Sequence, residues 1–348
     1  MIPQNSPIGI LLVNLGTPDA DTVPAVRRYL REFLMDGRVI DIPALPRFLL
    51  VNGIIAPFRA PKSTKTYKMV WLPDGSPLKV YGLGLEKEVQ KAMGDKYMVR
   101  LAMRYQNPSM AKILNEMRDA GVGHILVMPL FPQYASATTG SVMQELMDII
   151  GKWQAIPEIT IINKFWEHKS FINSFAVLGK KYLEEKQWDH ILFSYHGLPE
   201  RHIRKGDDYG VCKLGSCCDS IGPANKLCYR AQCFATSRAL AAALGIPQEM
   251  YTVCFQSRLG SDPWVKPYTE DIVKKLPKEG KKKVLVFSPA FVADCLETTE
   301  EIGEEYKEVF MEHGGEEWQL VESLNVSPTW VKAVVEMIHE RLPEVLMA

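Results

Sequence analysis

Two stretches of the sequence, HILVMPLFP (124–132) and KVLVFSPAF (283–291), resemble each other and decide the fold. Each is a run of apolar and β-branched residues, which is typical of a buried β-strand. A threonine-containing turn and a helical pattern follow both stretches, in SATTGSVMQELMDII (136–150) and CLETTEEIGEEYKEVF (295–310). The repeat therefore predicts the same strand-to-helix unit in each half of the chain.

Other short runs rich in β-branched residues alternate with helical stretches, as in parallel α/β proteins. We expect four strands in each half, at residues 8–15, 98–103, 124–130 and 159–165 and then at residues 190–195, 251–255, 283–287 and 319–324. The pattern predicts an α/β fold with two similar, doubly wound, Rossmann-like domains. The likeness of the two halves has two interpretations: an internal repeat, or the general resemblance between any two α/β domains. Both place ligands at the carboxyl ends of the strands.

The predicted domains cover residues 1–166 and residues 167–326, with a C-terminal helix over residues 327–348. A length of 348 residues suits two such domains. The formal net charge is zero, so no overall field attracts nucleic acid or an anionic membrane. No glycine-rich phosphate loop opens a predicted helix, which argues against enzymes that use dinucleotides or nucleoside triphosphates.

The protein is expected to be cytosolic, because its N-terminal stretch has the pattern of a strand and lacks the basic region and cleavage site of a signal peptide. The apolar stretch FLLVNGIIAPF (48–58) is shorter than the roughly 18–20 residues of a spanning helix. Arg47, Arg59 and Lys62 flank it, which leaves open peripheral contact with lipid, for example at an inner membrane. An exposed mouth of a binding pocket explains the same residues, and no pattern indicates an oligomeric state.

Unusual polar residues stand at three of the predicted strand ends. His196 ends the strand HILFSY and precedes a Gly-Leu-Pro turn, which suits a general base. A structural histidine is the alternative interpretation. Arg104 and Tyr105 end another strand, where a guanidinium and a phenol suit an anionic aromatic ligand or an anchor between domains. Trp264 and Phe291 add aromatic surface that could equally belong to the core.

Acidic residues crowd the segment after the strand at 283–287. Glu297, Glu301 and Glu305 recur every fourth residue and are expected to share one helix face. A solvated acidic face is the ordinary explanation of such a run. We favour instead a series of carboxylates that leads a divalent cation such as Fe²⁺ inward to Glu297.

Five of the seven cysteines lie between Cys212 and Cys233, in the pattern C-x4-CC-x9-C-x4-C. In a reducing compartment such a group binds metal more often than it forms disulfides. A [2Fe–2S] cluster needs four thiolates, and the candidates are Cys212, Cys217, Cys218, Cys228 and Cys233. We expect Cys212, Cys228, Cys233 and one of the adjacent pair to be the ligands. A structural Zn²⁺ held by four thiolates is the alternative.

Six motifs spread over almost the whole chain resemble those of the ferrochelatases, enzymes that insert ferrous iron into a porphyrin. They are LLVNLGTP (11–18), RYQNPS (104–109), PLFPQYASATTGS (129–141), FSYHGLPERHIRKGDDY (193–209), FQSRLGSDPWVKPYT (255–269) and FSPAFVADCLETTEEI (287–302). The resemblance implies the two-domain chelatase fold, in which each domain is built on a four-stranded parallel sheet flanked by helices. It also implies that residues 210–232 are largely an insertion, and some members of the family do carry a [2Fe–2S] cluster.

The resemblance implies a role for each of the candidate site residues. His196 and Glu297 would be the catalytic pair, and Glu301 and Glu305 would belong to the path of the metal. Porphyrin would contact Tyr67, Arg104, Tyr105, Trp264 and Phe291. Cys295 stands where many members have a second histidine, which leaves His196 as the main proton acceptor.

The substrates implied are Fe²⁺ and protoporphyrin IX, with haem as the product. Two alternatives remain open at this point. One is a related chelatase that uses another metal or coproporphyrin III. The other is a binding protein that carries porphyrin or an iron–sulfur cluster without chelatase activity.

Overall fold

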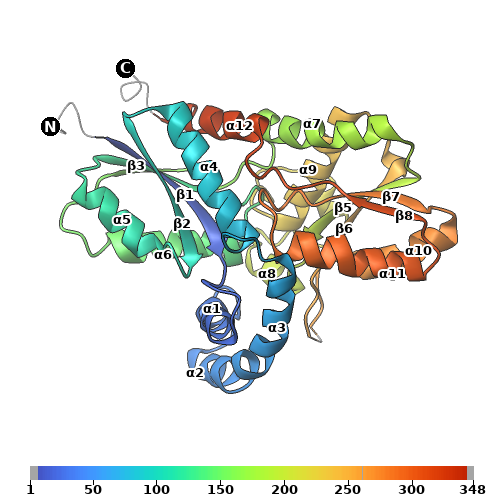
Figure 1. Cartoon of the computed structure of the whole chain (residues 1–348), viewed down its shortest axis with the longest axis horizontal. Helices are drawn as coiled ribbons and strands as arrows, with labels where there is room; N and C mark the ends of the chain where they lie inside the picture. The colour runs from blue at the N-terminus through green and yellow to red at the C-terminus, as the bar shows by residue number, and fades with distance from the viewer. Residues whose placement is uncertain (1–6, 261, 343–348) are drawn as a thin grey trace. The chain divides into compact units, whose positions relative to one another are not determined.

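The structure is a computed structural model that describes residues 7–260 and 262–342. The chain forms two compact units (Figure 1). The first comprises the described residues of Met1–Phe131, Ser136–Lys164 and Val331–Ala348, and the second comprises Pro132–Ala135 and Phe165–Trp330.

A parallel four-stranded sheet forms the centre of the first unit. Its strands are β1 (Ile8–Gly16), β2 (Tyr97–Tyr105), β3 (His124–Pro129) and β4 (Glu158–Ile161), in the order β2-β1-β3-β4. Because side chains alternate along a strand, Leu11 and Val13 of β1 face one side of the sheet. There they join the buried core formed by α5 (Met110–Asp119) and α6 (Ser141–Ile150), and α4 (Pro77–Met93) packs against the sheet through Gly82 and Leu101.

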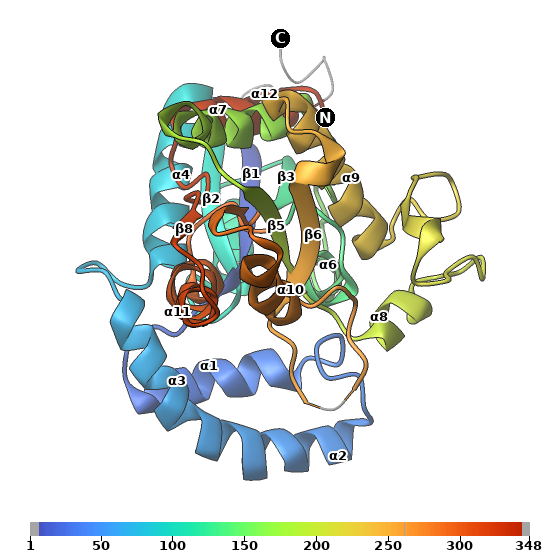
Figure 2. The same ribbon diagram turned by 90° about the vertical axis from the view of Figure 1, so that its right-hand side faces the viewer.

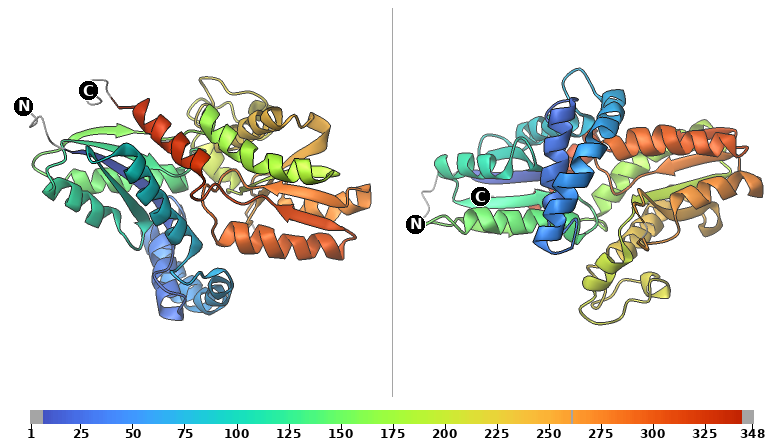
Figure 3. Two further views of the ribbon diagram at one scale, coloured as in Figure 1. Left: turned by 45° about the horizontal axis from the view of Figure 1, so that its top comes forward. Right: turned by 90° about the horizontal axis from the view of Figure 1, so that it is seen from below.

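A helical arm belongs to the same unit. It consists of α1 (Val23–Met35), α2 (Ala44–Leu49), the π-helical turn η1 (Leu50–Ile55) and α3 (Ala56–Val70). Figures 1 and 3 show these helices packed beside one another at one end of the unit. No described helix is both long enough and apolar enough to cross a membrane.

The second unit repeats the topology of the first. Its strands are β5 (His190–His196), β6 (Tyr251–Gln256), β7 (Lys283–Phe287) and β8 (Glu317–Leu320), in the order β6-β5-β7-β8. The helices and helical turns are α7 (Lys169–Glu185), α8 (Glu200–Lys205), η3 (Ser216–Cys218), α9 (Tyr229–Leu244), η4 (Gln248–Met250), α10 (Thr269–Lys275), η5 (Leu276–Glu279), η6 (Glu297–Glu305) and α11 (Tyr306–Glu312). The identical strand order confirms that the two halves share one fold.

Helices cover both faces of this second sheet as well. One core contains Leu192 and Val286 of the sheet with Ile302 and Phe310 from the chain after β7. On the other face α7 approaches β7 so closely that a Cβ atom on Gly179 would lie 2.4 Å from the Phe287 ring. The last helix, α12 (Pro328–His339), begins in the second unit and passes into the first at Val331.

All eight predicted strands are present, but the last strand of each sheet was predicted too long at its carboxyl end. β4 stops at Ile161 instead of 165, and β8 stops at Leu320 instead of 324. The apolar residues beyond these ends are still buried, since Phe165 is 4% exposed and Leu324 is 1% exposed. Their burial comes from loop packing rather than strand pairing, and apolar sequence alone does not distinguish the two.

The segment after each third strand is π-helical rather than regularly α-helical. The turn η2 (Ser136–Gly140) follows β3, and η6 (Glu297–Glu305) follows β7. In η6 the N–H of Tyr306 donates to the carbonyl of Glu301, five residues earlier. The expected α-helical face of glutamates is therefore part of a wider turn, and both copies of the fold have this irregularity.

The predicted insertion, residues 210–232, ends inside α9, which begins at Tyr229. Its part between α8 and α9, residues 210–228, is called the cysteine insertion below and contains only the short turn η3. Figure 2 shows it as two loops beyond α8 and the first turn of α9. Polar contacts hold these loops in place. Asp207 accepts hydrogen bonds from the N–H groups of Val211 and Cys212, and Asn225 donates to the carbonyls of Cys217 and Ser220.

Candidate functional site

His196 is the last residue of β5, so its side chain lies at the carboxyl end of the second sheet. Its Nδ1 atom is 2.7 Å from the carbonyl oxygen of Gly197. A carbonyl oxygen only accepts hydrogen bonds, so this contact places the proton of a neutral ring on Nδ1. The Nε2 atom then carries the lone pair that can accept a proton from a ligand.

Backbone contacts fix the loop that follows His196. The N–H of Gly197 donates to the carbonyl of Gln256 at 2.8 Å, and a Cβ atom on Gly197 would lie 2.7 Å from that oxygen. Only glycine allows this approach between the ends of β5 and β6. The N–H of Val265 donates to the carbonyl of Leu198 at 2.9 Å, which joins the loop to the segment that carries Trp264.

Aromatic rings stand on two sides of the imidazole. The ring centroids of Trp264 and Phe291 are each 6.5 Å from the centroid of His196. The indole N–H of Trp264 donates to the carbonyl of Leu259, which fixes its orientation. Three predicted site residues are therefore neighbours within the second unit, and they present flat apolar surface next to a proton acceptor.

Glu301 is the carboxylate most closely linked to this histidine. Its Oε2 atom accepts hydrogen bonds from Ser257 Oγ at 2.5 Å and Gln256 Nε2 at 3.2 Å, and its Oε1 atom accepts from Tyr306 at 3.3 Å. Burial raises the pKa of Glu301, and the negative charge of Glu297 raises it further, while Ser257 and the charge of His196 act in the opposite direction. Glu301 therefore interacts electrostatically with both members of the predicted catalytic pair.

Glu297 and Glu305 differ in their surroundings. Glu297 begins η6, is half-buried, and forms a side-chain hydrogen bond with Cys295. Cys295 is buried, and burial together with the charge of Glu297 raises the pKa of its thiol. Glu305 ends η6 and is exposed. The three glutamates thus run from a half-buried to an exposed position along one π-helix.

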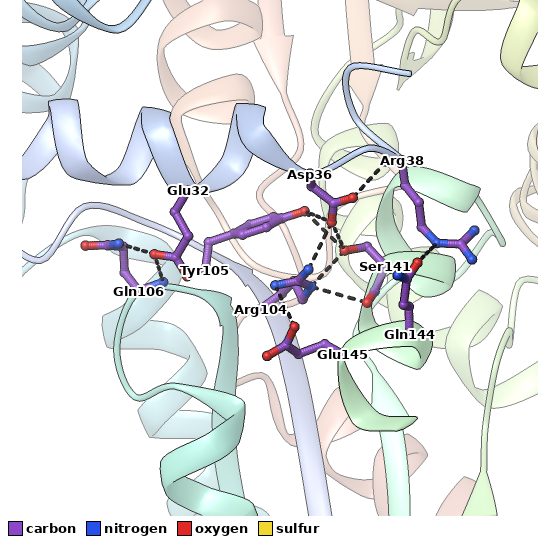
Figure 4. A network of polar contacts seen from close by, with 9 residues as sticks. All are labelled: Glu32, Asp36, Arg38, Arg104, Tyr105, Gln106, Ser141, Gln144 and Glu145. Atoms are coloured by element: carbon purple, nitrogen blue, oxygen red, sulfur yellow. Dashed lines mark hydrogen bonds and ion pairs between the residues drawn. The ribbon is translucent and has the colours of Figure 1, made fainter. Parts of the chain in front are cut away.

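The first unit has its own polar network at the carboxyl end of its sheet (Figure 4). The carboxylate of Asp36, just beyond α1, is its centre. Its Oδ2 atom accepts hydrogen bonds from Ser141 Oγ at 2.5 Å, Tyr105 at 2.8 Å and Arg104 Nη2 at 3.0 Å, while the N–H of Arg38 donates to Oδ1 at 2.7 Å. Arg104 and Tyr105 are therefore held together as predicted neighbours, but their partners here are Asp36 and Ser141.

The ionisation of this network follows from its contacts. Burial alone would raise the pKa of Asp36, but hydrogen bonds from Ser141, Arg38 and Tyr105 and the charge of Arg104 outweigh it, so the pKa is lowered. Burial and the nearby charge of Asp36 raise the pKa of the Tyr105 phenol far above its usual range. The group thus contains a carboxylate, a guanidinium and a neutral phenol at ordinary pH.

Tyr67, the remaining predicted contact of porphyrin, lies in α3 of the arm. It is buried, and its ring meets those of Tyr29 and Trp71 edge-on, with centroids 6.4 and 6.3 Å away. The arm also exposes six large apolar side chains, four of them in the stretch 48–58 for which a pocket mouth or lipid contact was predicted. They are Leu45, Phe48, Leu49, Ile54, Phe58 and Met69.

Sequence reasoning missed Asp36, Ser141 and Ser257, which hold the charged groups. Ser257 follows β6 with a φ of 64°, and Gln106 follows β2 at the equivalent position with a φ of 68°. Both residues occupy the left-handed region that favours glycine, which stores strain at a strand end. Position directly after a predicted strand was a signal for Ser257 alone, because Asp36 follows α1 and Ser141 begins α6.

All five clustered cysteines influence at least one other member, and Cys233 does so through Cys218. The Sγ atoms of Cys217 and Cys218 are 3.9 Å apart. A hydrogen bond with Cys218 lowers the pKa of Cys228, and the N–H groups of Ala231 and Arg230 add to this effect against burial. Cys212, Cys217 and Cys228 line one cavity of about 120 Å³.

Cys233 has different surroundings. It is fully buried in α9, and burial raises the pKa of its thiol, which forms a hydrogen bond with Tyr229. Within residues 7–260 and 262–342, no three His, Cys, Asp or Glu side chains already converge as the ligands of one metal ion. The thiols nevertheless suit a soft metal site, since Cys212, Cys217 and Cys228 line one cavity and the N–H of Lys213 donates to Cys217 Sγ at 3.2 Å.

The geometry can now be compared with known proteins. A family model described as Ferrochelatase matches residues 7–342. The chain is 44% identical over 342 residues to a ferrochelatase of Coxiella burnetii (strain Dugway 5J108-111), which spans 98% of this chain and 96% of that relative. It is also 44% identical over 334 residues to a ferrochelatase of Legionella pneumophila (strain Corby), across 96% and 99% of the two chains.

Similarity to solved structures concerns the fold. SirB from Bacillus subtilis with Fe3+ has a TM-score of 0.53 at 11% sequence identity, over 96% of this chain and 95% of that one. A sirohydrochlorin chelatase SirB from Bacillus subtilis subspecies spizizenii in complex with cobalt gives a TM-score of 0.52 at 12% identity, over 96% and 94%. At this level of identity, the similarity shows a common chelatase fold.

Proposed function

The chain belongs to the ferrochelatase family, and from this premise we propose that it inserts Fe²⁺ into protoporphyrin IX to form protohaem with release of two protons. The observation that carries the proposal is the group formed by His196, Glu301 and Glu297 at the carboxyl end of β5 and the start of η6. It combines a proton acceptor with two carboxylates, which are the groups that exchange of protons for a cation requires.

His196 is the acceptor of pyrrole protons in this mechanism. The contact of Nδ1 with Gly197 supports this role, because it leaves the lone pair on Nε2 and holds the ring in one orientation. The rings of Trp264 and Phe291, which lie next to the imidazole, suit a flat apolar ligand. A wall that holds the macrocycle bent would expose the nitrogen lone pairs, which favours the transition state over the flat substrate.

Glu297 and Glu301 provide negative charge for the incoming cation, and Glu305 begins the path at the exposed end of η6. The raised pKa of Glu301 suits a group that takes up a proton when the cation leaves it for the porphyrin. We propose that Tyr67, Arg104 and Tyr105 also contact the porphyrin. Their support is the Arg104 guanidinium held by Asp36, the Tyr105 ring beneath it and the Tyr67 ring packed on Tyr29, both tyrosines being buried.

A [2Fe–2S] cluster is proposed for the cysteine insertion. The contacts favour Cys212, Cys217, Cys218 and Cys228 as its ligands, since Cys233 faces Tyr229 inside α9. When bound, such a cluster would cross-link loops that have little apolar core of their own and would add a one-electron redox centre. Zn²⁺ on the same thiolates would supply the cross-link alone.

A cluster and a zinc ion are distinguished by the visible absorption spectrum of protein purified without oxygen, together with iron, zinc and acid-labile sulfide contents. Charge-transfer bands with two irons and two sulfides per chain support the cluster. The variant Cys233→Ser is expected to retain the metal, whereas Cys228→Ser is expected to lose it. The reverse result would restore the expectation that Cys233 is a ligand.

Chelatase activity is tested by an anaerobic steady-state assay of haem formation. We expect Fe²⁺ with protoporphyrin IX to give a higher kcat/KM than Co²⁺, and than coproporphyrin III with Fe²⁺. A preference for coproporphyrin III or for cobalt would assign the protein to another chelatase. A chain that binds porphyrin tightly but never yields haem would instead be a carrier protein.

The exposed apolar residues of the helical arm are proposed to rest on a lipid surface, so that the protein binds the membrane peripherally. Arg59 and Lys62 lie among them and suit anionic headgroups, whereas Arg47 donates to the carbonyls of Ile40 and Ile42. Co-sedimentation with vesicles of 30 mol% phosphatidylserine tests this, with Phe58→Ser as the variant. Binding that does not depend on Phe58 would favour a pocket mouth only.

A further inference from the structure

The cysteine insertion and the catalytic histidine meet at the first turn of α9. This helix begins directly after Cys228, so Tyr229 and Arg230 follow a proposed metal ligand without any intervening residue. Both side chains are nearly buried, at 8% and 9% exposure. Each side chain contacts a thiol of the cluster, Tyr229 that of Cys233 and Arg230 that of Cys218, and each also reaches the loops at the ends of β5 and β6.

Tyr229 reaches the histidine itself. Its hydroxyl donates a hydrogen bond of 2.8 Å to the carbonyl oxygen of His196. That carbonyl belongs to the peptide group that joins His196 to Gly197, and the next carbonyl, of Gly197, accepts the bond from Nδ1 of the imidazole. The position of Tyr229 therefore limits how the ring that accepts protons can turn.

A second tie between α9 and β5 lies one residue earlier on the strand. The hydroxyl groups of Tyr195 and Ser237 are 2.8 Å apart, and both residues are fully buried. Ser237 is two turns further along α9 than Tyr229. The helix and the strand end consequently move together rather than independently.

Arg230 joins the insertion to the loop of Trp264. Its Nε and Nη2 atoms donate to the carbonyl of Lys266 at 3.2 and 3.1 Å, and its Nη1 atom donates to the carbonyl of Gly215 at 3.5 Å. Gly215 lies between the cysteines at 212 and 217, and Lys266 is two residues from Trp264. One planar guanidinium thus spans a metal-binding loop and a wall of the proposed porphyrin site.

We propose that Tyr229 and Arg230 are positioning residues that couple metal binding by the cysteine insertion to the orientation of His196 and Trp264. The inference rests on the proposed cluster and deepens it by assigning residues to its communication with the catalytic group. Metal bound to Cys228 and its neighbours holds the first turn of α9 and Gly215 in place. Without the metal, that turn is freer, and so are the two carbonyl groups that orient the site.

The test compares Tyr229→Phe with a matched control, Tyr251→Phe. Tyr251 is equally buried at 8% exposure, and its hydroxyl donates to Gln248 at 2.7 Å at the start of β6, the opposite end of the same sheet. Each variant loses one hydroxyl. Each is purified anaerobically, and its metal and sulfide contents are measured before and after treatment with a chelator.

The direct readout is the ¹⁵N resonance pattern of the His196 ring in porphyrin-free protein, assigned by its loss in His196→Gln. In the unaltered protein, removal of the metal is expected to shift these resonances and to lower kcat about tenfold with little change in the KM for porphyrin. Tyr229→Phe is expected to keep its metal, to show the shifted resonances already, and to respond to chelation less than twofold. Tyr251→Phe is expected to behave as the unaltered protein.

Arg230→Lys keeps the positive charge but lacks the planar fork, so we expect lower metal content as well as lower kcat. The coupling is overturned if chelation leaves the His196 resonances of the unaltered protein unchanged, or if Tyr229→Phe matches Tyr251→Phe in resonances and kcat. Protein that never contains metal refutes the cluster and its coupling together. If Tyr229→Phe still shifts the His196 resonances in such metal-free protein, Tyr229 positions the histidine but does not couple it to metal binding.

Discussion

Ser257 donates a hydrogen bond of 2.5 Å to Glu301 from a backbone that lies in the left-handed region, with a φ of 64°. A serine there costs about 1–3 kcal/mol of strain, and the surrounding structure must compensate for it. The bond orients a carboxylate whose pKa burial has raised. Removing the charge of Glu301 should therefore change both the stability of the fold and the rate of the reaction.

Glu301→Gln is expected to stabilise the fold at neutral pH and to impair the reaction. Because the pKa of Glu301 is raised in the folded protein, its contribution to stability is present below about pH 4 and is lost as pH rises through the folded value. The glutamine side chain is neutral at every pH, so the variant does not lose this stability as the pH rises. Each pKa unit corresponds to about 1.4 kcal/mol, so Tm at pH 7.5 should rise by roughly 2–4 °C per unit.

Glu304→Gln is the control for this change, because Glu304 is an exposed residue of the same π-helix. Thermal unfolding of Glu304→Gln should show no such pH-dependent gain. Iron insertion by Glu301→Gln should fall at least tenfold in kcat, because the side chain no longer binds a cation or a proton. Equal gains in Tm at pH 4.5 and pH 7.5 would contradict the assigned protonation.

Asp36→Asn is expected to have the opposite pH dependence. The pKa of Asp36 is lowered in the folded state, so its stabilisation is present above the unfolded value of about 4 and disappears as pH falls below it. The amide leaves Arg104 with a weaker partner and should cost about 2–3 kcal/mol at pH 7. Urea unfolding at pH 7 and below pH 3 measures the difference, which should shrink at the lower pH.

Gly197→Ala is expected to disturb the catalytic loop. Its Cβ atom would lie 2.7 Å from the carbonyl of Gln256, so one of the two strand ends must move. Overpacking of this kind costs about 1–3 kcal/mol. We expect kcat to fall more than KM rises, since the displaced loop carries His196. Gly222→Ala, where no atom lies within 4 Å of the added Cβ, should leave both values unchanged.

His196→Ala is expected to lower kcat by about 10²–10⁴-fold while porphyrin still binds, because the proton acceptor is removed and the aromatic walls remain. Porphyrin fluorescence gives the binding constant, and haem formation gives the rate. The rate of the variant should rise with added imidazole, which can enter the space of the lost ring. Full activity in this variant would refute the proposed role of the residue.

Most of the fold was predictable from the sequence, and the reasons are local. Strands such as β7 (Lys283–Phe287) are continuous apolar runs between helical patterns, because both faces of a parallel sheet are buried. The strand ends that carry His196 and Arg104 followed from that topology. The π-helical turns did not, since a π-helix uses the same residue types as an α-helix and differs only in which carbonyl each N–H selects.

The polar partners of the site residues could not be predicted from the sequence either. Asp36 and Tyr105 are 69 positions apart and meet only because α1 ends over the carboxyl edge of the sheet. The role of Tyr229 depends on the direction in which α9 leaves the insertion. Contacts of this kind depend on the three-dimensional path of the chain, whereas residue patterns report on segments of a few turns.

The widened turn of η6 has a consequence for how the chain can change. Deleting one residue between Glu297 and Glu301 would let the segment close into an ordinary α-helix, with every amide bonded four residues back. Such a shortened protein would gain a more regular helix and lose the alignment of one carboxylate with Ser257. In the second unit the irregular turn thus fixes the direction of one acidic group toward Ser257 at the expense of a regular helix.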